Sequence, residues 1–127
     1  MEEFRKQLVL RLRTVLAMTQ IWGGMRAPQG TVGDYIMVWR LVGRRVYTHD
    51  GQTPLVEERY NIGCYSKKAE DCEELLAAVE SAIGTFTGLL GTVEVSNIKL
   101  VETIDTDYRD DLGYYVFSAD YLVQYYK

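Results

Sequence analysis

The chain has few of the residue types on which chemical sites depend. His49 is its only histidine, which excludes a multi-histidine metal site or a histidine pair within one chain. His49 stands beside Asp50 at an expected turn, and no nucleophile motif accompanies it. We therefore interpret it as a turn residue, and we expect neither catalysis nor a bound cofactor.

Cysteines and long apolar runs are also scarce. The two cysteines, Cys64 in an expected strand and Cys72 in an expected helix, show no disulfide-framework spacing, so we interpret both as buried free thiols. No apolar run approaches the roughly 20 residues that a membrane span needs. The charged start of the chain lacks the apolar core of a secretory signal. We expect a protein that stays in the cytoplasm where it is made, with no membrane partner.

The sequence does not match the patterns of two further kinds of ligand site, a calcium loop and a phosphate- or dinucleotide-binding loop. The acidic segment 105–113 suggests a cation loop, but Arg109 stands where the calcium-loop pattern needs Asp or Asn. Gly84, Gly88 and Gly91 fit neither the phosphate-binding loop nor the dinucleotide fingerprint. We interpret the first segment as an acidic surface loop and the second as a flexible connection.

The composition is adequate for one hydrophobic core. With 127 residues, 47% of them hydrophobic, the chain is expected to form a single domain over residues 1–127. Its net charge of -4 argues against specific or general nucleic-acid binding. Residues 1–60 carry +3 and residues 61–127 carry -7. On charge alone we favour two solvated faces of a monomer, and the alternative is self-association through complementary patches.

Two amphipathic helices are expected. The first covers residues 3–18, where one apolar stripe contains Phe4, Leu8, Leu12, Val15 and Leu16. The second begins at Ser66 as N-cap and runs through Ile83, where Gly84 ends it, and its stripe contains Cys72, Leu75, Leu76, Val79 and Ile83. The glycine-rich segment 22–33 is expected to be an extended or mobile connection.

Strands are expected over residues 35–42, 55–65, 98–104 and 114–126, with an uncertain additional strand near Val93. In residues 55–65, the alternation places Val56, Tyr60, Ile62 and Cys64 toward the core. Asp50-Gly51 indicates a turn between the first two strands, and Pro54 favours a longer loop over 44–54. The expected fold is α+β, an antiparallel or mixed sheet of four to five strands with two helices on one face, in the order α-β-β-α-β-β.

The expected loops supply candidate contact residues. From their expected exposure we select Arg44, Arg45, His49 and Asp50 on the hairpin loop, and Tyr108, Arg109, Asp110 and Asp111 on the acidic loop. The last twenty residues also concentrate six tyrosines: Tyr108, Tyr114, Tyr115, Tyr121, Tyr125 and Tyr126. Packing on the sheet and burial in a protein interface explain these tyrosines equally well.

Several segments, taken in order, carry a family resemblance. They are an amphipathic first helix, a Gly/Pro loop, and residues 35–39 (YIMVW), 48–51 (THDG), 59–66 (RYNIGCYS) and 118–126 (SADYLVQYY). This order resembles the tail-completion, or tail-terminator, proteins of long-tailed bacteriophages over nearly the whole chain. The resemblance implies a non-enzymatic protein that forms a ring, generally of six subunits. That ring caps the finished tail tube and docks on the head-side connector.

The expected function is therefore structural. The implied partners are other copies of the chain, the tail tube protein and the head–tail connector protein, in the host cytoplasm during assembly and at the head-proximal end of the virion tail afterwards. One alternative is another neck component, such as a head-completion protein. A more distant alternative is a small ferredoxin-like ligand-binding protein or enzyme, which would need a deep apolar pocket with convergent polar groups.

Overall fold

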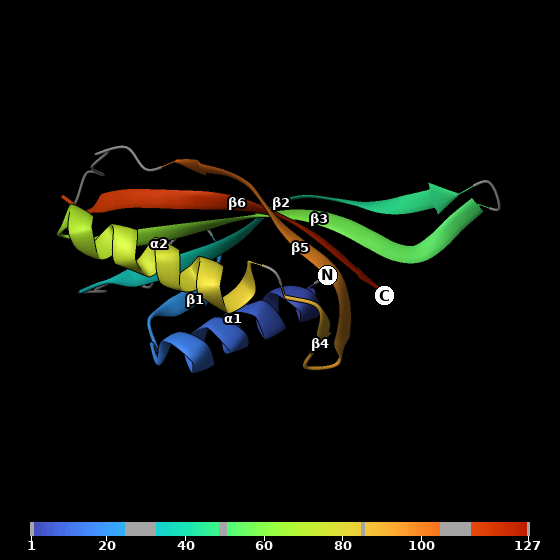
Figure 1. The fold of residues 1–127 in the computed structure, drawn as a ribbon, viewed down its shortest axis with the longest axis horizontal. Coiled ribbons are helices and arrows are strands. Elements are labelled where there is room, and N and C mark those ends of the chain that lie inside the picture. Colours follow the sequence, from blue (N-terminus) through green and yellow to red (C-terminus); the bar gives the residue numbers. More distant parts are fainter. Residues whose placement is uncertain (1, 25–32, 49–50, 85, 105–112, 127) are drawn as a thin grey trace.

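A computed structural model describes residues 2–24, 33–48, 51–84, 86–104 and 113–126, and for residues 2–3, 42–48, 51–54 and 104 the description is of the backbone. The described residues form two helices and six strands (Figure 1). Their order is α1 (Glu2–Leu16), β1 (Ile21–Gly23), β2 (Tyr35–Thr48), β3 (Gly51–Ser66), α2 (Ala69–Ile83), β4 (Gly88–Leu90), β5 (Val93–Ile104) and β6 (Tyr115–Tyr126).

The strands form one mixed sheet in the order β1-β2-β3-β6-β5-β4. Only the β1–β2 pair is parallel, and all other neighbours are antiparallel. Both helices lie on the same face of the sheet, and the opposite face is open over the centre (Figure 1). The predicted α+β class and helix placement agree with this architecture, whereas the predicted four to five strands and the order α-β-β-α-β-β are wrong.

The first helix follows the predicted stripe with one exception. Phe4, Leu8 and Leu12 are fully buried because their spacing of four residues places them on the side that faces the sheet. Val15 was predicted on the same stripe but is 51% exposed. The helix ends earlier than residue 18, since Ala17 adopts a positive φ of 53° that a right-handed helix does not allow.

The second helix begins later than predicted. Ser66 is the last residue of β3 rather than the N-cap, which is Lys68 in an extended conformation. Ser66 still supports the turn, because its Oγ accepts a hydrogen bond from the Lys68 N–H at 3.2 Å. Gly84 is the C-cap as predicted. The buried side of α2 contains Cys72, Val79, Ala82 and Ile83.

The β2–β3 hairpin is longer than the sequence indicated. Residues 44–48 and 51–54, predicted as loop, are strand, and Thr48 pairs with Gly51, so two residues connect the strands. The pairing shifts between Arg45 and Tyr47, where residues 53–55 stand opposite a single residue of β2. Pro54 lies within this irregularity, and a bulge is a position where a residue without an N–H is tolerated in a strand. This bulge explains how the strand continues past a proline.

Short edge strands account for the remaining differences. Ile21–Gly23 and Gly88–Leu90 form three-residue strands that cover only part of β2 and β5. The predicted fragments near Val93 and at 98–104 are one strand, β5, with irregular pairing between Val95 and Asn97. Gly91 has a positive φ of 62° in the β4–β5 turn, and a side chain there would collide with Gln7 of α1.

The core lies between the helices and the inner face of the sheet. The inward alternation predicted for β3 is confirmed, since Val56, Tyr60, Ile62 and Cys64 are all buried. Both cysteines are buried free thiols, also as predicted. Tyr121 and Tyr125 belong to this core, and Tyr114 packs in a second cluster with Tyr35 and Met37. For Tyr114, Tyr121 and Tyr125, the structure therefore favours packing on the sheet over burial in a protein interface.

A carboxylate lies within this apolar core. Glu58 is on the inward side of β3 and its side chain has no exposed surface. Its Oε1 accepts hydrogen bonds from the hydroxyls of Tyr60 and Tyr125 at 2.9 and 3.0 Å, and its Oε2 pairs with Nη1 of Arg40 at 3.0 Å. The Phe4 ring stacks on Tyr125 at 4.8 Å between centroids. The interaction therefore joins β2, β3, β6 and α1.

Removal of the Arg40 cation should destabilise the fold, because Glu58 would stay buried without its counter-charge. We expect Arg40→Met to lower the free energy of unfolding at neutral pH by about 1–3 kcal/mol. The double variant Arg40→Met/Glu58→Gln should recover at least half of that loss, since a neutral amide needs no counter-charge. Urea unfolding of the four proteins in the cycle measures both values. If Arg40→Met and the double variant lost the same free energy of unfolding, the assigned Arg40–Glu58 pair would be contradicted.

Candidate interaction surfaces

Most residues predicted for contacts lie outside the described part of the chain. They are His49, Asp50, Tyr108, Arg109, Asp110 and Asp111. Arg44 and Arg45 belong to β2, where their backbones pair with those of Glu57 and Val56. The contacts of all eight side chains therefore stay predictions.

The strand ends nevertheless fix where the two predicted groups attach. At one end of the sheet, the hairpin continues to Thr48 and Gly51, beyond the last β3–β6 pair at Leu55 and Tyr126. At the other end, β5 finishes at Ile104 and β6 begins at Tyr115. Figure 1 shows the hairpin projecting away from the two helices. The hairpin therefore extends from one end of the sheet, and segment 105–112 is connected to the strands at the opposite end.

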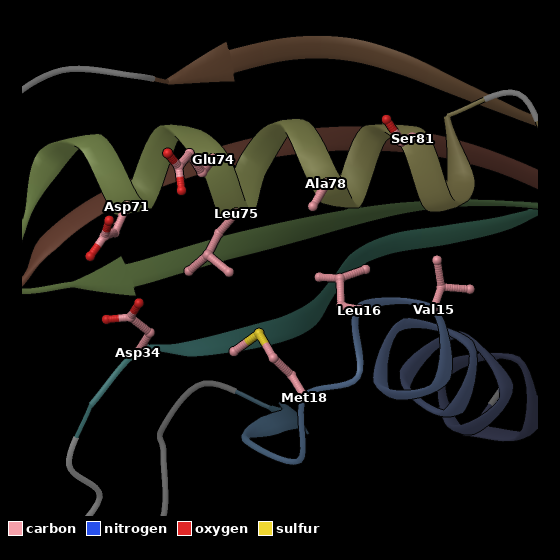
Figure 2. A pocket seen from close by; sticks show the side chains of 9 residues that line it. All are labelled: Val15, Leu16, Met18, Asp34, Asp71, Glu74, Leu75, Ala78 and Ser81. Carbon is pink, nitrogen blue, oxygen red and sulfur yellow. The ribbon is translucent and has the colours of Figure 1, made fainter.

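A groove with a volume of about 620 Å³ lies between the C-terminal end of α1, the start of β2 and α2. Its lining residues come from three segments far apart in the sequence: Val15, Leu16, Met18, Asp34, Asp71, Glu74, Leu75, Ala78 and Ser81. Figure 2 shows Asp34 and Asp71 at one end of the groove and Val15 and Ser81 at the other. We call this surface the acidic groove.

The acidic groove combines an apolar floor with negative charge. Leu16, Met18 and Leu75 are partly buried and pack against the main core. The three charged lining residues are all acids: Asp34, Asp71 and Glu74. Burial raises the pKa of the neighbouring Cys72 thiol, and the carboxylates of Asp34 and Asp71 raise it further. The groove therefore favours a cationic or amphipathic group over an anionic one.

A second hollow, of about 610 Å³, lies along the N-terminal part of α1 and carries the opposite charge. Its three charged lining residues are Arg5, Lys6 and Arg13. Leu10 lies among them and is 51% exposed, although its side chain is apolar. Arg13 is held in place because its Nε and Nη2 donate to the Ile21 carbonyl at 2.9 and 2.7 Å. We call this surface the basic α1 face.

The open face of the sheet carries an ion-pair network. Arg59 donates from Nε and Nη2 to Oδ2 of Asp120 at 3.2 and 2.8 Å, and Asn61 donates to Oδ1 at 2.7 Å. Asp120 is buried beneath them, while Glu102 approaches Arg59 at 3.7 Å and is mostly exposed. Because its polar groups already pair within the sheet, this network stabilises the strands rather than presenting unmet charge.

The titratable core groups are not arranged for nucleophilic chemistry. Burial raises the pKa of Cys64 and of the Tyr60 and Tyr121 hydroxyls, which keeps these groups neutral at physiological pH. A thiol with a raised pKa supplies little thiolate. Within the described residues, no three His, Cys, Asp or Glu side chains are grouped to hold a metal ion. No helix in the same residues is long and apolar enough to cross a membrane.

Comparison with known proteins showed a likeness of fold. No protein-family model matches the chain, and no curated protein sequence matches it. Among solved structures, the fold is similar to a chain in the virion of a native gene transfer agent particle. The TM-score is 0.68 at 12% sequence identity, over 91% of this chain and 84% of the other. At this identity the likeness establishes a shared fold.

The sequence predictions missed the two surfaces that the structure assembles. Asp34, Asp71 and Glu74 are separated in the sequence and each resembles an ordinary solvated acid. The basic contacts predicted from the positively charged first 60 residues are Arg44 and Arg45. The basic α1 face is instead lined by Arg5, Lys6 and Arg13 of the same half. The exposed Leu10 among those cations was the signal available in the sequence, because it falls outside the predicted apolar stripe.

The buried tyrosines predict a loss of stability in alkali. The Tyr121 pKa is raised first by burial and then by the negative charge of Glu80. Above about pH 10, the unfolded chain releases a phenolic proton that the folded chain retains, so stability falls as pH rises, by up to about 1.4 kcal/mol per pH unit for each such group. Tyr121→Phe should make this fall shallower, as measured by urea unfolding between about pH 9 and pH 11. An unchanged slope would exclude Tyr121 as a contributor.

Proposed function

We propose that this chain is a structural protein of a phage-type virion whose copies form a ring on the tail tube. The ring covers the last exposed face of the tube, ends its growth and offers a docking surface to the head. The observation that carries the proposal is the shared fold, over 91% of the chain, with a chain of a gene transfer agent virion. The resemblance of residues 35–39, 48–51, 59–66 and 118–126 to tail-terminator proteins supports the same role.

The two-ended sheet is suited to a ring that joins two structures. The hairpin with Arg44 and Arg45 extends from one end, and segment 105–112 attaches at the other. A tail-terminator ring must contact the tube on one side and the connector on the other. We propose that these two ends serve the two contacts, with His49 and Asp50 on the first and Tyr108 to Asp111 on the second.

The proposed partners are proteins only. Six copies would form the ring, and the tail tube protein and the head–tail connector protein would bind its two sides. The ring would assemble in the host cytoplasm and remain at the head-proximal end of the virion tail. A domain of residues 1–127 with both an acidic groove and a basic α1 face has the opposite charges that self-association requires.

Another neck component, such as a head-completion protein, is the second candidate. The similar chain belongs to the virion of a gene transfer agent particle, so the shared fold is compatible with this role as well. Immuno-electron microscopy of tails from a mutant that makes no heads separates the two. A terminator labels one end of these free tails, whereas a head-completion protein leaves them unlabelled.

Sedimentation with isolated tail tubes tests the proposal directly. Tubes assembled without this protein, from its own phage, should take up the purified chain in a ring at one end. The capped tubes should no longer elongate when tube protein is added. Failure of the chain to bind tube ends, or continued elongation after binding, would exclude the terminator role.

Reversal of the hairpin charges should weaken docking. We expect Arg44→Glu/Arg45→Glu to reduce binding to tube ends or to the connector by about tenfold or more, because it replaces two cations with two anions at the base of the projecting hairpin. Binding is measured by cosedimentation, and virion yield gives the result in infected cells. Lys68→Glu/Lys99→Glu, which changes the net charge equally at two exposed positions, is the matched control. Equal binding by wild type and the hairpin variant would remove these arginines from the interface.

A further inference from the structure

We infer that, in the ring proposed above, the acidic groove of each subunit binds the basic α1 face of the next subunit. This inference rests on the proposed ring and identifies the surfaces that build it. The occupant of the groove is therefore a second copy of this chain, with Leu10 facing the groove floor and its flanking cations facing the groove acids.

Charge complementarity is the first argument. The described lining of the groove has three acids and no cation, and that of the basic α1 face has three cations and no acid. The chain as a whole carries -4, so two copies approaching at random repel each other. Contact between these two surfaces instead places opposite charges together, which selects one orientation over the others. Association should accordingly weaken as salt concentration rises.

Apolar complementarity is the second argument. Leu10 is half exposed at the centre of the basic α1 face, where solvent contact with its side chain is unfavourable. The groove offers Leu16, Met18 and Leu75 beneath its acids, and Val15 at one end is 51% exposed. Docking would cover these side chains together and leave the charges around the rim. An apolar centre with a charged rim is the usual arrangement of a protein interface.

The positions of the two surfaces on α1 make the contact repeatable. Lys6 lies near the start of the helix and Leu16 at its end, ten residues or about 15 Å further along. Each copy therefore has one surface of each kind and can contact two neighbours at once. Because the two surfaces differ, copies can associate head-to-tail, and such contacts produce a ring when the rotation closes. A two-fold dimer would instead bring both surfaces of each copy against one partner, so the size of the assembly in sedimentation separates the two arrangements.

A charge exchange tests the contact. Lys6→Glu and Glu74→Lys are chosen because both side chains are exposed, and neither change places a buried charge. Each variant alone should weaken self-association by about tenfold or more, as measured by sedimentation velocity at low salt. The double variant in one chain should recover association, since every interface again has opposite charges.

A mixture of the two single variants gives the sharpest result. The reversed charge at position 6 in Lys6→Glu matches the reversed charge at position 74 in Glu74→Lys, and the remaining two surfaces are wild type and also match. An equimolar mixture should therefore form alternating assemblies, whereas each variant alone stays largely monomeric. Lys99→Glu and Glu94→Lys on β5 are the matched controls, with the same charge changes at exposed sheet positions. These controls should associate like wild type.

Chemical cross-linking covers the case of weak association in solution. A carbodiimide joins a lysine amine directly to a carboxylate, and isotope-labelled chains mixed with unlabelled chains distinguish links between molecules. We expect a link from Lys6 to Glu74 or Asp71 between labelled and unlabelled chains, free or on tail tubes. Melting temperatures of all variants confirm that they fold.

The possible results separate the two proposals. Normal capping of tail tubes by both single variants, with no intermolecular Lys6 link, would overturn this inference and leave the terminator role intact. Self-association that follows the charge exchange, without any binding to tubes, would support the contact and exclude the terminator role. A link from Lys6 only to the tube or connector protein would also overturn the inference, because the basic α1 face would then bind a different partner.

Discussion

The buried Glu58 carboxylate is the interaction on which the rest of the fold depends. Its partners Tyr60, Tyr125 and Arg40 come from three adjacent strands. Phe4 of α1 stacks on the Tyr125 ring and contacts the Tyr60 ring at a tilt. A carboxylate in such a position is costly unless every partner is present. A one-residue slip of β3 would move it to the open face and break its contacts with Arg40 and Tyr125, which belong to the neighbouring strands. The network thus couples strand register to the placement of the first helix.

Regular apolar spacing made the large elements predictable. Phe4, Leu8 and Leu12 define one helix, and the alternation on β3 identifies its inward side. The same alternation places Glu58 inward, but its charge argues for exposure, and only its three partners reverse that expectation. The short strands β1 and β4 have too few residues for any periodicity. The extension of β3 past Pro54 depends on irregular pairing with β2, which is a property of two strands together.

The surfaces were less predictable than the fold because they combine distant segments. The acidic groove joins the end of α1, the start of β2 and the middle of α2, and its acids belong to both halves of the chain. Charge balance along the sequence therefore indicated that complementary patches were possible without indicating where the negative one lies. The basic α1 face, by contrast, comes mainly from one helix, so its lining residues are close together in the sequence. The eight predicted contact residues remain a separate prediction about the two ends of the sheet.

The far part of the β2–β3 hairpin has a thermodynamic consequence. Beyond Leu55 the described strands pair only with each other, and Figure 1 shows no helix beneath them. A two-stranded ribbon without a third strand or a covered face is marginally stable in water. Ordering this ribbon costs conformational entropy that few contacts within the chain offset, and a surface that binds the ribbon would supply the contacts that the chain itself does not. Assembly would then contribute directly to the stability of this part of the protein.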